Sequence, residues 1–327
     1  MTATVLVTGG AGYIGSVVAD QLLTRGHDVV VLDDLSTGHR EAVPAGVTFV
    51  HAGIGDRAAV TALFDRHPVH AIVHLAAFAL VAESVANPDK YRVNNVGNAR
   101  VLLDAAVAAG VQRFVFSSSC TVYGIPAAVP IPEDAATAPM SPYGETKLEF
   151  ERVLRDYAVR HRLSSVSLRY FNAAGATEQR GEDHDPESHL IPNVLAVALG
   201  KRPAVDIFGT DYPTPDGTAV RDYIHVDDLA DAHVRAVDLT PDGAIALNLG
   251  TGQGSSVRQV VDLARRLTGH AIPATDQPRR PGDPPVLVAA AQRAAAVLGW
   301  RPRRSSLEEI LASAWRWHRA YPRGYRS

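Results

Sequence analysis

The first half of the chain alternates short apolar segments with longer amphipathic ones. The short segments are rich in Val and Ile, as buried strands are, whereas the longer segments repeat their apolar residues at helical spacing. The expected strands are residues 4–8, 28–33, 47–51, 71–75, 113–118 and 165–169, and the expected helices are residues 12–25, 57–66, 89–109 and 142–161. This alternation predicts an α/β fold with a doubly wound parallel (Rossmann) sheet.

The pattern changes after Asn172. Residues 173–188 are polar, Gly-rich and acidic, and we expect them to form a solvated surface loop. Helical patterns return at residues 191–199, 226–239, 256–267, 290–298 and 306–319, and a strand at 244–248 is expected to rejoin the main sheet. We therefore expect a dinucleotide-binding domain at 1–172 and a smaller C-terminal α/β lobe at 173–327, with some segments returning to the main sheet.

Composition narrows the class of protein. The 327 residues are 46% hydrophobic and 20% charged, and their net charge of −3 argues against a general nucleic-acid binder. Cys120 is the single cysteine, so no intramolecular disulfide can form and a cysteine-based zinc site is not expected. The longest apolar run, residues 71–82, is shorter than the roughly 20 residues that a membrane span needs. These features predict a cytoplasmic protein with neither a membrane segment nor a nucleic-acid partner.

A glycine-rich turn follows the first expected strand. Gly10, Gly12 and Gly15 fit the pattern G-x-G-x-x-G, and Gly9, Gly12 and Gly15 fit G-x-x-G-x-x-G. Glycines allow the unusual backbone angles of the turn and the close approach of a pyrophosphate, and the helix N-terminus that follows attracts phosphate. The order strand, turn, helix therefore predicts a dinucleotide site.

Asp33 ends the second expected strand and indicates which dinucleotide binds. A carboxylate at this place accepts hydrogen bonds from the ribose hydroxyls of the adenosine and repels a 2′-phosphate. Asp34 follows where a basic residue would be expected for NADP. The sequence therefore favours NAD.

A candidate catalytic group lies at the start of the helix expected at 142–161. Ser141 is a plausible N-cap with Pro142 in the first turn, and Tyr143 and Lys147 are four residues apart on one face. The lysine ammonium would lower the pKa of the phenol and let it exchange a proton with a substrate hydroxyl. Ser119, at the carboxyl end of the fifth expected strand, can hydrogen-bond the same hydroxyl. We therefore predict Ser119, Tyr143 and Lys147 as catalytic residues.

These motifs, together with residues 168–172 (LRYFN), resemble those of the extended short-chain dehydrogenases/reductases. Within them, several segments resemble the UDP-glucose 4-epimerase family: residues 118–124, 141–144, 208–212, 216–226, 248–252 and 279–283. The resemblance covers nearly the whole chain. It implies inversion at C4 of a UDP-hexose, UDP-glucose or UDP-galactose, through a 4-keto sugar with tightly bound NAD. Tyr143 would take the 4-OH proton while C4 passes hydride to the nicotinamide, and the ketose would turn about its diphosphate link before the hydride returns.

The resemblance also implies which residues bind cofactor and substrate. The implied NAD contacts are Gly9, Gly12, Tyr13, Ile14, Gly15, Asp33, Asp34, Ser36, Thr37, Gly38, Ile54, Leu75, Ala76, Ala77, Asn95, Ser117, Tyr143, Lys147, Tyr170 and Phe171. The implied substrate contacts, mostly in the C-terminal lobe, are Ser119, Thr121, Tyr143, Asn172, His189, Leu190, Val205, Ile207, Phe208, Arg221, Arg280, Asp283 and Leu287. Arg221 and Arg280 would hold the diphosphate with their forked guanidinium groups.

Four positions qualify this picture. Gly53 stands where the family usually has an Asp at the adenine, Ala79 where many members have a Lys near the pyrophosphate, and His189 where an Asn is common. Leu287 aligns with the position that shapes the pocket near the sugar 2-substituent. A leucine is intermediate in size, so UDP-glucose and UDP-galactose are the expected main pair, and the N-acetylated sugars remain open.

Other functions remain to be weighed. A sugar 4,6-dehydratase needs an acid and a base where this chain has Cys120 and Thr121. A UDP-GlcNAc 4-epimerase, a UDP-uronate 4-epimerase or a decarboxylase remains an alternative. The alternative of another class is an NAD-binding sensor without catalysis, although such proteins typically lose the Tyr or the Lys that this chain keeps.

Two expectations remain: the chain binds no metal, and it forms a homodimer. His184 and His189, with Asp183 and Asp185 nearby, include no helical i, i+4 histidine pair, so a metal is not predicted. Relatives often dimerise through the two long helices, here residues 89–109 and 142–161. The alanines at the end of the first would permit close packing: Ala105, Ala106, Ala108 and Ala109.

Overall fold

The computed structural model describes residues 3–280 and 282–325. The chain folds into two compact units, and each is made of several segments. The first unit contains the chain up to Gly124, Thr137–Arg169 and Ala230–Leu247, and the second contains Ile125–Ala136, Tyr170–Leu229 and the chain from Asn248. The change of unit after Arg169 lies close to the domain boundary predicted at 172. Residues 125–136 belong to the second unit, although the residues on both sides of them belong to the first. Residues 230–247 belong to the first unit, although the residues on both sides of them belong to the second.

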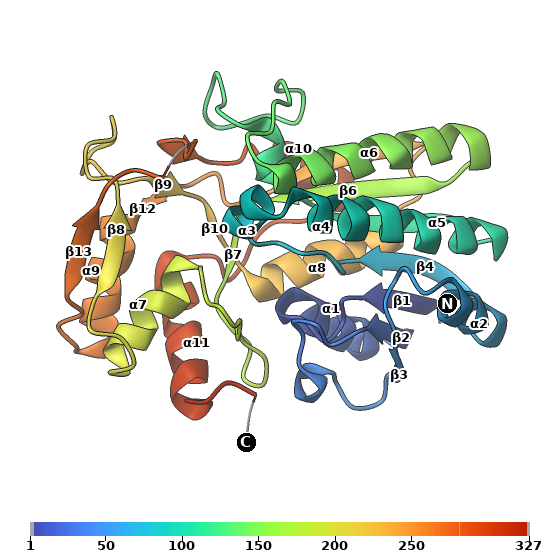
Figure 1. Cartoon of the computed structure of the whole chain (residues 1–327), viewed down its shortest axis with the longest axis horizontal. Coiled ribbons are helices and arrows are strands. Elements are labelled where there is room, and N and C mark those ends of the chain that lie inside the picture. The colour runs from blue at the N-terminus through green and yellow to red at the C-terminus, as the bar shows by residue number, and fades with distance from the viewer. Residues whose placement is uncertain (1–2, 281, 326–327) are drawn as a thin grey trace. The chain divides into compact units, whose positions relative to one another are not determined.

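A seven-stranded sheet is the centre of the first unit (Figure 1). Its strands, in the order in which they lie in the sheet, are β11 (Ala244–Leu249), β6 (Ser164–Tyr170), β5 (Arg113–Ser119), β4 (Val69–His74), β1 (Thr4–Thr8), β2 (Asp28–Asp33) and β3 (Thr48–His51). Strands β1 to β5 pair in parallel. The order of connection reverses between β1 and β4, which is the switch point where ligands bind in such sheets. The predicted doubly wound fold and the return of a strand at 244–248 are confirmed.

Helices cover this sheet. They are α1 (Tyr13–Thr24), α2 (Arg57–Arg66), α3 (Val81–Ala86), α4 (Pro88–Arg92), α5 (Ala99–Ala108), α6 (Pro142–His161) and α8 (Val226–Val237), with short helical turns η1 (Arg40–Ala42) and η3 (Cys120–Tyr123). The apolar faces of α2, α5 and α6 join the side chains of the strands in one buried core. The helix predicted at 89–109 is interrupted, because residues Val93–Asn98 (η2) form a π-helical turn between α4 and α5. Such turns are frequent at functional sites.

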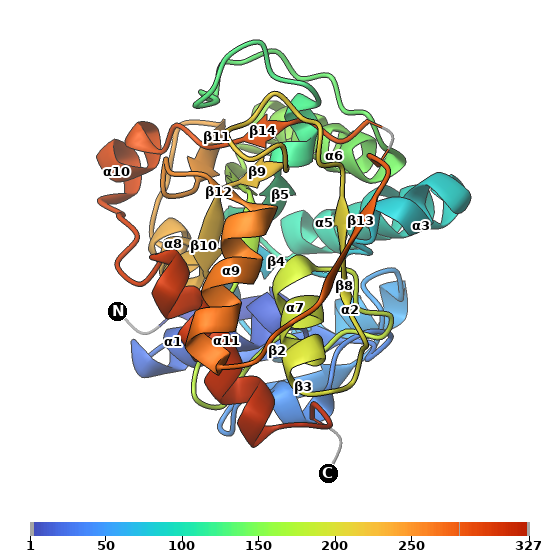
Figure 2. The same cartoon turned by 90° about the vertical axis from the view of Figure 1, so that its left-hand side faces the viewer.

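The second unit combines short strand pairs with a helical core. β7 (Asn172–Ala174) pairs with β10 (Tyr223–His225), β8 (Val205–Phe208) with β13 (Ala274–Gln277), and β9 (Val220–Arg221) with both β12 (Ser255–Ser256) and β14 (Val286–Leu287). Helices α7 (Leu190–Ala198), α9 (Val257–Thr268) and α11 (Leu307–Ala320) pack together around a second apolar core (Figure 2), and α10 (Gln292–Leu298) precedes α11. The helices predicted in the second half of the chain, α8 included, are confirmed, and their ends lie within two residues of the predicted ends.

The expectation of a solvated loop at 173–188 is wrong for its first part. Arg180 and Glu182 are both less than 10% exposed, although both are charged. A Cβ on Gly181 would lie 2.2 Å from the indole ring of Trp317, so a glycine is needed for this close approach. The Gly181 amide donates to the hydroxyl oxygen of Tyr325. Aromatic side chains from the C-terminal segment therefore cover a stretch whose composition suggests a surface loop.

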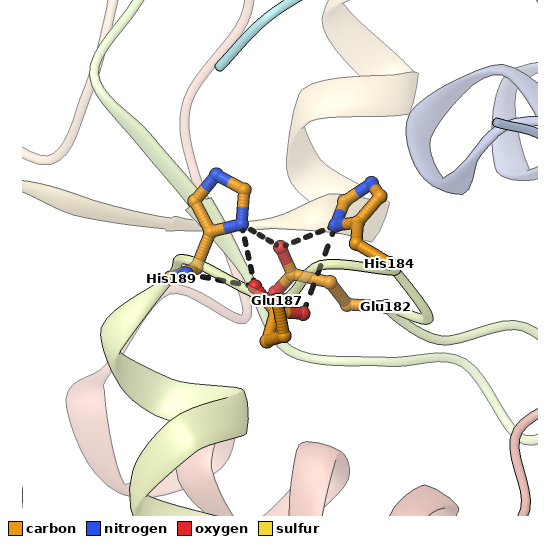
Figure 3. A group of neighbouring side chains, drawn as sticks. All are labelled: Glu182, His184, Glu187 and His189. Atoms are coloured by element: carbon orange, nitrogen blue, oxygen red, sulfur yellow. Dashed lines mark hydrogen bonds and ion pairs between the residues drawn. The ribbon is translucent and has the colours of Figure 1, made fainter. Parts of the chain in front are cut away.

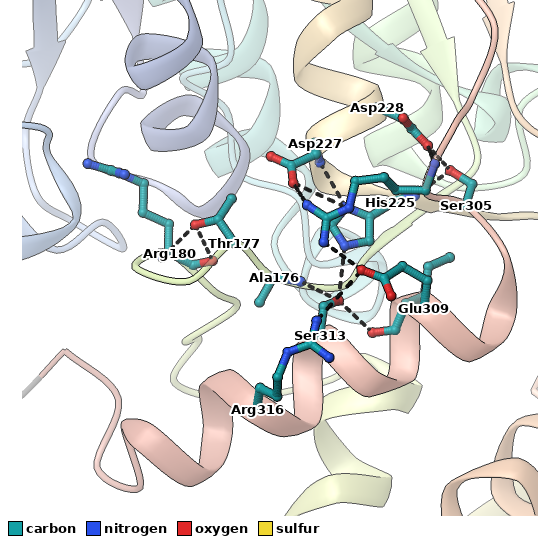
Figure 4. Close-up of polar contacts among 12 residues, drawn as sticks. Ala176, Thr177, Arg180, His225, Asp227, Asp228, Ser305, Glu309, Ser313 and Arg316 are labelled. Carbon is teal, nitrogen blue, oxygen red and sulfur yellow. Dashed lines mark hydrogen bonds and ion pairs between the residues drawn. The ribbon is translucent and has the colours of Figure 1, made fainter. Parts of the chain in front are cut away.

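His225 is at the centre of a polar network that ties β10 to α11 (Figure 4). Its Nδ1 accepts a hydrogen bond from the Asp227 amide, and its Nε2 lies 2.9 Å from the Ser313 hydroxyl oxygen. Ser313 also accepts from the Ala176 amide and donates to the Ile310 carbonyl. Burial lowers the pKa of His225, so its ring is neutral and donates through Nε2. The histidine is therefore part of the scaffold of the second unit.

The helices of the described residues include none that is both long and apolar enough to cross a membrane.

Candidate active site

The glycines of the turn after β1 are needed for two different structural reasons. Gly9 has a positive φ of 71°, and a Cβ there would lie 2.7 Å from the Ala76 amide nitrogen. A Cβ on Gly15 would lie 2.0 Å from the Gly9 carbonyl oxygen. By contrast, a Cβ on Gly12 would meet, among the described residues, only that carbonyl oxygen at 3.3 Å. Packing of the turn therefore explains Gly9 and Gly15, while the glycine at Gly12 leaves space for a ligand.

Helix α1 begins at this open position. Gly12 is its N-cap, and no side chain of the described residues caps the helix there. The first amides and the positive end of the helix dipole favour an anion at this point. The turn therefore fits the pyrophosphate of a dinucleotide.

Asp33 joins the end of β2 to the glycine turn. One of its carboxylate oxygens accepts from the Ala11 amide at 2.9 Å and the other from the Leu35 amide at 2.8 Å. Burial raises the pKa of Asp33, and these two hydrogen bonds oppose that rise. Each oxygen keeps a second lone pair. The predicted contact with a ribose remains a prediction, and it is compatible with the bonds that Asp33 already makes.

Gly53 lies near Asp34 with room to spare. A Cβ on Gly53 would be 3.7 Å from an Asp34 carboxylate oxygen, which is an ordinary contact distance. Asp34 in turn accepts a hydrogen bond from the Ser36 amide. The glycine at 53 is therefore not demanded by the packing of the described residues.

Ser119, Tyr143 and Lys147 belong to two elements that pack closely. Ser119 ends β5, and the other two lie in the first two turns of α6. Ser141 caps α6 by accepting a hydrogen bond from the Gly144 amide at 3.2 Å, as predicted. A Cβ on Gly144 would lie 2.9 Å from the Thr121 carbonyl oxygen. This glycine lets the first turn of α6 approach the segment that follows Ser119.

Lys147 is buried beneath this turn, with 3% of its surface exposed. Its ammonium donates to the Ser117 carbonyl oxygen at 2.8 Å and lies 5.6 Å from the centre of the Tyr143 ring. The ring of Phe116 contacts the ammonium from β5, with its centre 5.0 Å away. Burial lowers the pKa of Lys147 to about 7. The ammonium is therefore held beside the tyrosine in a mainly apolar environment, where its charge acts strongly.

The Ser119 hydroxyl is oriented by Thr121. Its oxygen accepts hydrogen bonds from the Thr121 amide at 3.2 Å and from the Thr121 hydroxyl at 3.0 Å. Both bonds use the serine oxygen as acceptor, so the serine proton is available for donation. Thr121, predicted as a substrate contact, thus has a positioning contact with the predicted catalytic serine.

Asn95, predicted as a cofactor contact, connects the loop after β4 with α6. Its amide bonds both the Phe78 amide and the Phe78 carbonyl, at 2.9 and 3.0 Å, and donates to the Thr146 hydroxyl at 3.3 Å. Thr146 donates to the Tyr143 carbonyl at 2.7 Å. The cofactor contact of Asn95 remains a prediction, and its hydrogen bonds position the helix that carries Tyr143.

A buried ion pair beneath the catalytic segment was missed by the sequence analysis. Arg169 of β6 bonds both carboxylate oxygens of Glu151 in α6, at 2.8 and 2.6 Å. The same carboxylate accepts from the Ser118 hydroxyl, and Arg169 donates to the Tyr123 hydroxyl. No local spacing indicates the pair, because the two residues are 18 positions apart and lie in different elements. The pair ties β5, β6, η3 and α6 together, so it supports the segment that carries Ser119.

In the second unit, several predicted substrate contacts pair with one another. Arg221 of β9 forms an ion pair with Asp283 at 2.5 Å and lies opposite Leu287 of β14. The Arg280 guanidinium stacks over the ring of Phe208, 4.1 Å from its centre. The side chains of Val205 and Ile207, two other predicted contacts, are buried in the core of the unit. Any contact of those two residues with substrate would therefore use the backbone.

Comparisons with known proteins agree with this geometry. The model of the "NAD dependent epimerase/dehydratase family" matches residues 5–250. A UDP-glucose 4-epimerase of Streptomyces lividans is 51% identical over 99% of each chain. The chain belongs to this epimerase/dehydratase family.

Solved structures give the same answer for the fold. The UDP-glucose 4-epimerase of Brucella ovis in complex with NAD is 47% identical, with a TM-score of 0.93 over 96% of this chain and 98% of that one. The enzyme of Bifidobacterium longum in complex with NAD+ and UDP is 38% identical, with a TM-score of 0.94 over 98% of this chain and 100% of that one. The architecture of the epimerase family therefore extends over nearly the whole chain.

Burial of Lys147 predicts a stability cost that depends on pH. The unfolded chain binds the lysine proton with the ordinary pKa of 10.5 and the folded chain with a pKa of about 7. Between pH 7 and pH 10.5 the unfolded chain binds more protons than the folded chain, so the free energy of unfolding rises with pH. The free-energy cost of burying the charge is therefore complete below pH 7 and absent above pH 10.5. This pKa shift corresponds to a cost of up to about 5 kcal/mol in the free energy of unfolding. A variant without the lysine avoids this cost but also loses the hydrogen bond to Ser117, which is worth about 1–2 kcal/mol.

We therefore expect Lys147→Met to stabilise the nucleotide-free protein by roughly 2–4 kcal/mol at pH 6, and by less at pH 9. Thermal unfolding of both proteins at the two pH values measures this. Lys201→Met, a change at an exposed lysine, is the matched control and should have little effect at either pH. A destabilised Lys147→Met variant, or a gain independent of pH, would contradict the assignment of a costly buried charge.

Proposed function

We infer that this protein inverts C4 of a UDP-hexose reversibly, with UDP-glucose and UDP-galactose as its pair and NAD as its bound cofactor. The observation that carries the inference is the buried Lys147 ammonium beside Tyr143 at the carboxyl end of β5. The fold and sequence relationship to enzymes named UDP-glucose 4-epimerase supports the same reaction.

The chain supplies the proton transfers of this reaction. Tyr143, with its phenolate favoured by Lys147, takes the proton of the sugar 4-OH, and Ser119 donates a hydrogen bond to the same oxygen. A bound NAD would supply the acceptor, and then the donor, of the hydride at C4. C4 is thereby a ketone between the two transfers, and the return of hydride to its other face inverts the centre. Tyr143 then gives its proton back to the C4 oxygen, so that neither protons nor electrons are lost over the cycle.

Residues of the second unit are proposed to hold the nucleotide diphosphate. Arg221 bonds Asp283 and the Val220 carbonyl, which uses only part of its five donors. The remaining donors of Arg221, together with Arg280, suit the oxygens of a diphosphate. Binding through the diphosphate leaves the sugar free to turn, as inversion requires.

The dehydratase alternative lacks its proton carriers in this structure. Elimination of water needs an acid and a base near the sugar. Cys120 is buried, and the Thr121 hydroxyl bonds the oxygen of Ser119. The two positions therefore offer no carboxyl group for the elimination.

Tyr143→Phe tests the proposed reaction. The variant should lose at least about 10²-fold in turnover of UDP-galactose, because general acid–base catalysis contributes about 10²–10⁴-fold. Nucleotide released by denaturation should be NAD in equal amounts from variant and wild type. Tyr157→Phe, on the same helix but bonded to Asp104, is the control and should retain turnover. A wild-type holoprotein that turns over no UDP-hexose would favour the non-catalytic sensor instead.

Leu287 is the residue proposed to set sugar specificity. It lies in β14 opposite Arg221 and is buried. We expect a higher kcat/KM for UDP-galactose than for UDP-GlcNAc, and we expect Leu287→Ala to narrow that ratio because it enlarges the pocket. Measuring both pairs on both proteins decides the point. Faster turnover of UDP-GlcNAc by the wild type would overturn the choice of main substrate.

We also propose that the enzyme is cytoplasmic and forms a homodimer through α5 and α6. One part of the expected contact face needs correction, because Ala106 is fully buried in the core of its own unit. Ala108 and Ala109 are exposed and remain available. Light scattering at micromolar concentration should give twice the mass of one chain, and a monomer would refute the proposal.

A further inference from the structure

Two glutamates and two histidines converge at the start of α7 (Figure 3). Glu182, His184 and Glu187 lie in the segment before the helix, and His189 is its N-cap residue. Among the described residues, this is the group of His, Cys, Asp or Glu whose ligand atoms come close enough to hold a metal ion. We call these four residues the Glu-His cluster.

The distances within the Glu-His cluster suit one small cation. Each residue offers one ligand atom, and the four atoms all lie within 4.8 Å of one another. His189 Nδ1 is 2.8 Å from a Glu182 oxygen and 3.0 Å from a Glu187 oxygen, and His184 Nδ1 is 3.4 Å from that Glu182 oxygen. Ligands about 2.0–2.1 Å from a tetrahedral zinc ion are about 3.3 Å from one another. Only small side-chain movements would therefore place all four atoms around one ion.

The side chains also have the required orientation. Figure 3 shows both imidazole rings turning one nitrogen toward the carboxylates and the other away from them. The Glu187 oxygen that faces His189 also accepts from the His189 amide at 2.7 Å, which fixes this carboxylate at the helix N-terminus. The Glu182 side chain is only 6% exposed. A buried carboxylate needs a cationic partner to offset its desolvation.

We propose that Glu182, His184, Glu187 and His189 form a binding site for a divalent metal ion of the zinc class. Two carboxylates and two neutral imidazoles balance the charge of such an ion. Mixed nitrogen and oxygen ligands suit zinc and its neighbours among the transition metals, whereas magnesium and calcium prefer oxygen ligands alone.

The sequence predicts no metal here, because the two histidines are not one helical turn apart. Here the spacing E-x-H-x-x-E-x-H lies in a loop, and folding of the loop brings the ligands together. The inference does not depend on the proposed epimerase reaction. A metal here would join the segment at 182–187 to the first turn of α7.

In the absence of metal, the same residues form ion pairs. Burial opposes charge on His184, but the hydrogen bonds that its ring donates to Glu182 and Glu187 raise its pKa to about 9. The charge of Glu182 raises the pKa of His189 to about 11. The alternative to the proposal is therefore that the cluster is an ion-pair network without any metal.

Zinc titration of the full-length, untagged protein distinguishes the two. After EDTA treatment and dialysis, calorimetric titration with ZnCl2 should show one saturable site per chain, and MgCl2 should show none. Cobalt(II) added in place of zinc should develop the visible absorption of a tetrahedral complex. A wild-type protein that binds no stoichiometric zinc, or that binds magnesium equally well, would overturn the proposal.

Substitutions in the Glu-His cluster test whether zinc binds there. His184→Ala and Glu187→Gln should each weaken zinc binding at least about 100-fold, since even residues that only orient a ligand are worth about 10–100-fold. His270→Ala, an exposed histidine elsewhere in the second unit, should bind zinc as the wild type does. Zinc should raise the melting temperature of wild type and of His270→Ala but not of His184→Ala. Unchanged zinc affinity in both cluster variants would show that the metal binds elsewhere and would overturn the assignment.

These readouts do not involve turnover. Failure of the metal proposal would leave the epimerase activity untouched, and a protein that lacked the activity could still bind zinc. Far-ultraviolet circular dichroism and the amount of bound NAD check that each variant is folded. Glu187→Gln preserves the shape of the side chain, so it remains informative if the alanine variant is unstable.

Discussion

The hydrogen bond from the buried Lys147 ammonium to the Ser117 carbonyl is the contact on which the candidate active site depends. It joins α6 to the end of β5, so that the tyrosine of one element and the serine of the other are held by the same lysine. Burial of a charge is costly, and the structure offsets it with one backbone acceptor and two aromatic rings. The buried charge therefore costs stability at the position where, in the proposed reaction, it acts on Tyr143.

The surroundings of this contact explain why it is well defined. The ion pair of Glu151 and Arg169 fixes β6 and α6 beneath the same strand end. The first turn of α6 is held by a second set of contacts: Asn95 donates to the Thr146 hydroxyl, which donates to the Tyr143 carbonyl. These residues have fixed partners of their own, so they position the elements that carry Tyr143 and Ser119.

The elements with strong local patterns could be predicted from the sequence, and so could the motifs attached to them. Strands β1 to β6 and helix α6 follow from apolar periodicity, and the glycine turn and the Ser141 cap follow from local backbone requirements. The short strand pairs of the second unit could not be predicted, because two to four residues carry little periodicity and their partners are distant in the chain. Gly181, the neighbour of Glu182, contacts Trp317 and Tyr325 near the C-terminus, and no local pattern near residue 181 indicates these contacts. The Glu-His cluster was not predicted for a different reason: its four residues have no helical spacing, and the fold of the loop brings them together.

The central claim is that the hydride leaving C4 is returned to the same carbon, while Tyr143 exchanges only the hydroxyl proton. Incubation of the holoprotein with UDP-galactose deuterated at C4, in ordinary water, tests this most directly. The account predicts that the UDP-glucose formed retains the deuterium at C4, as measured by nuclear magnetic resonance or mass spectrometry. Loss of the label to water would mean that C4 exchanges a proton instead of a hydride, and would contradict the account.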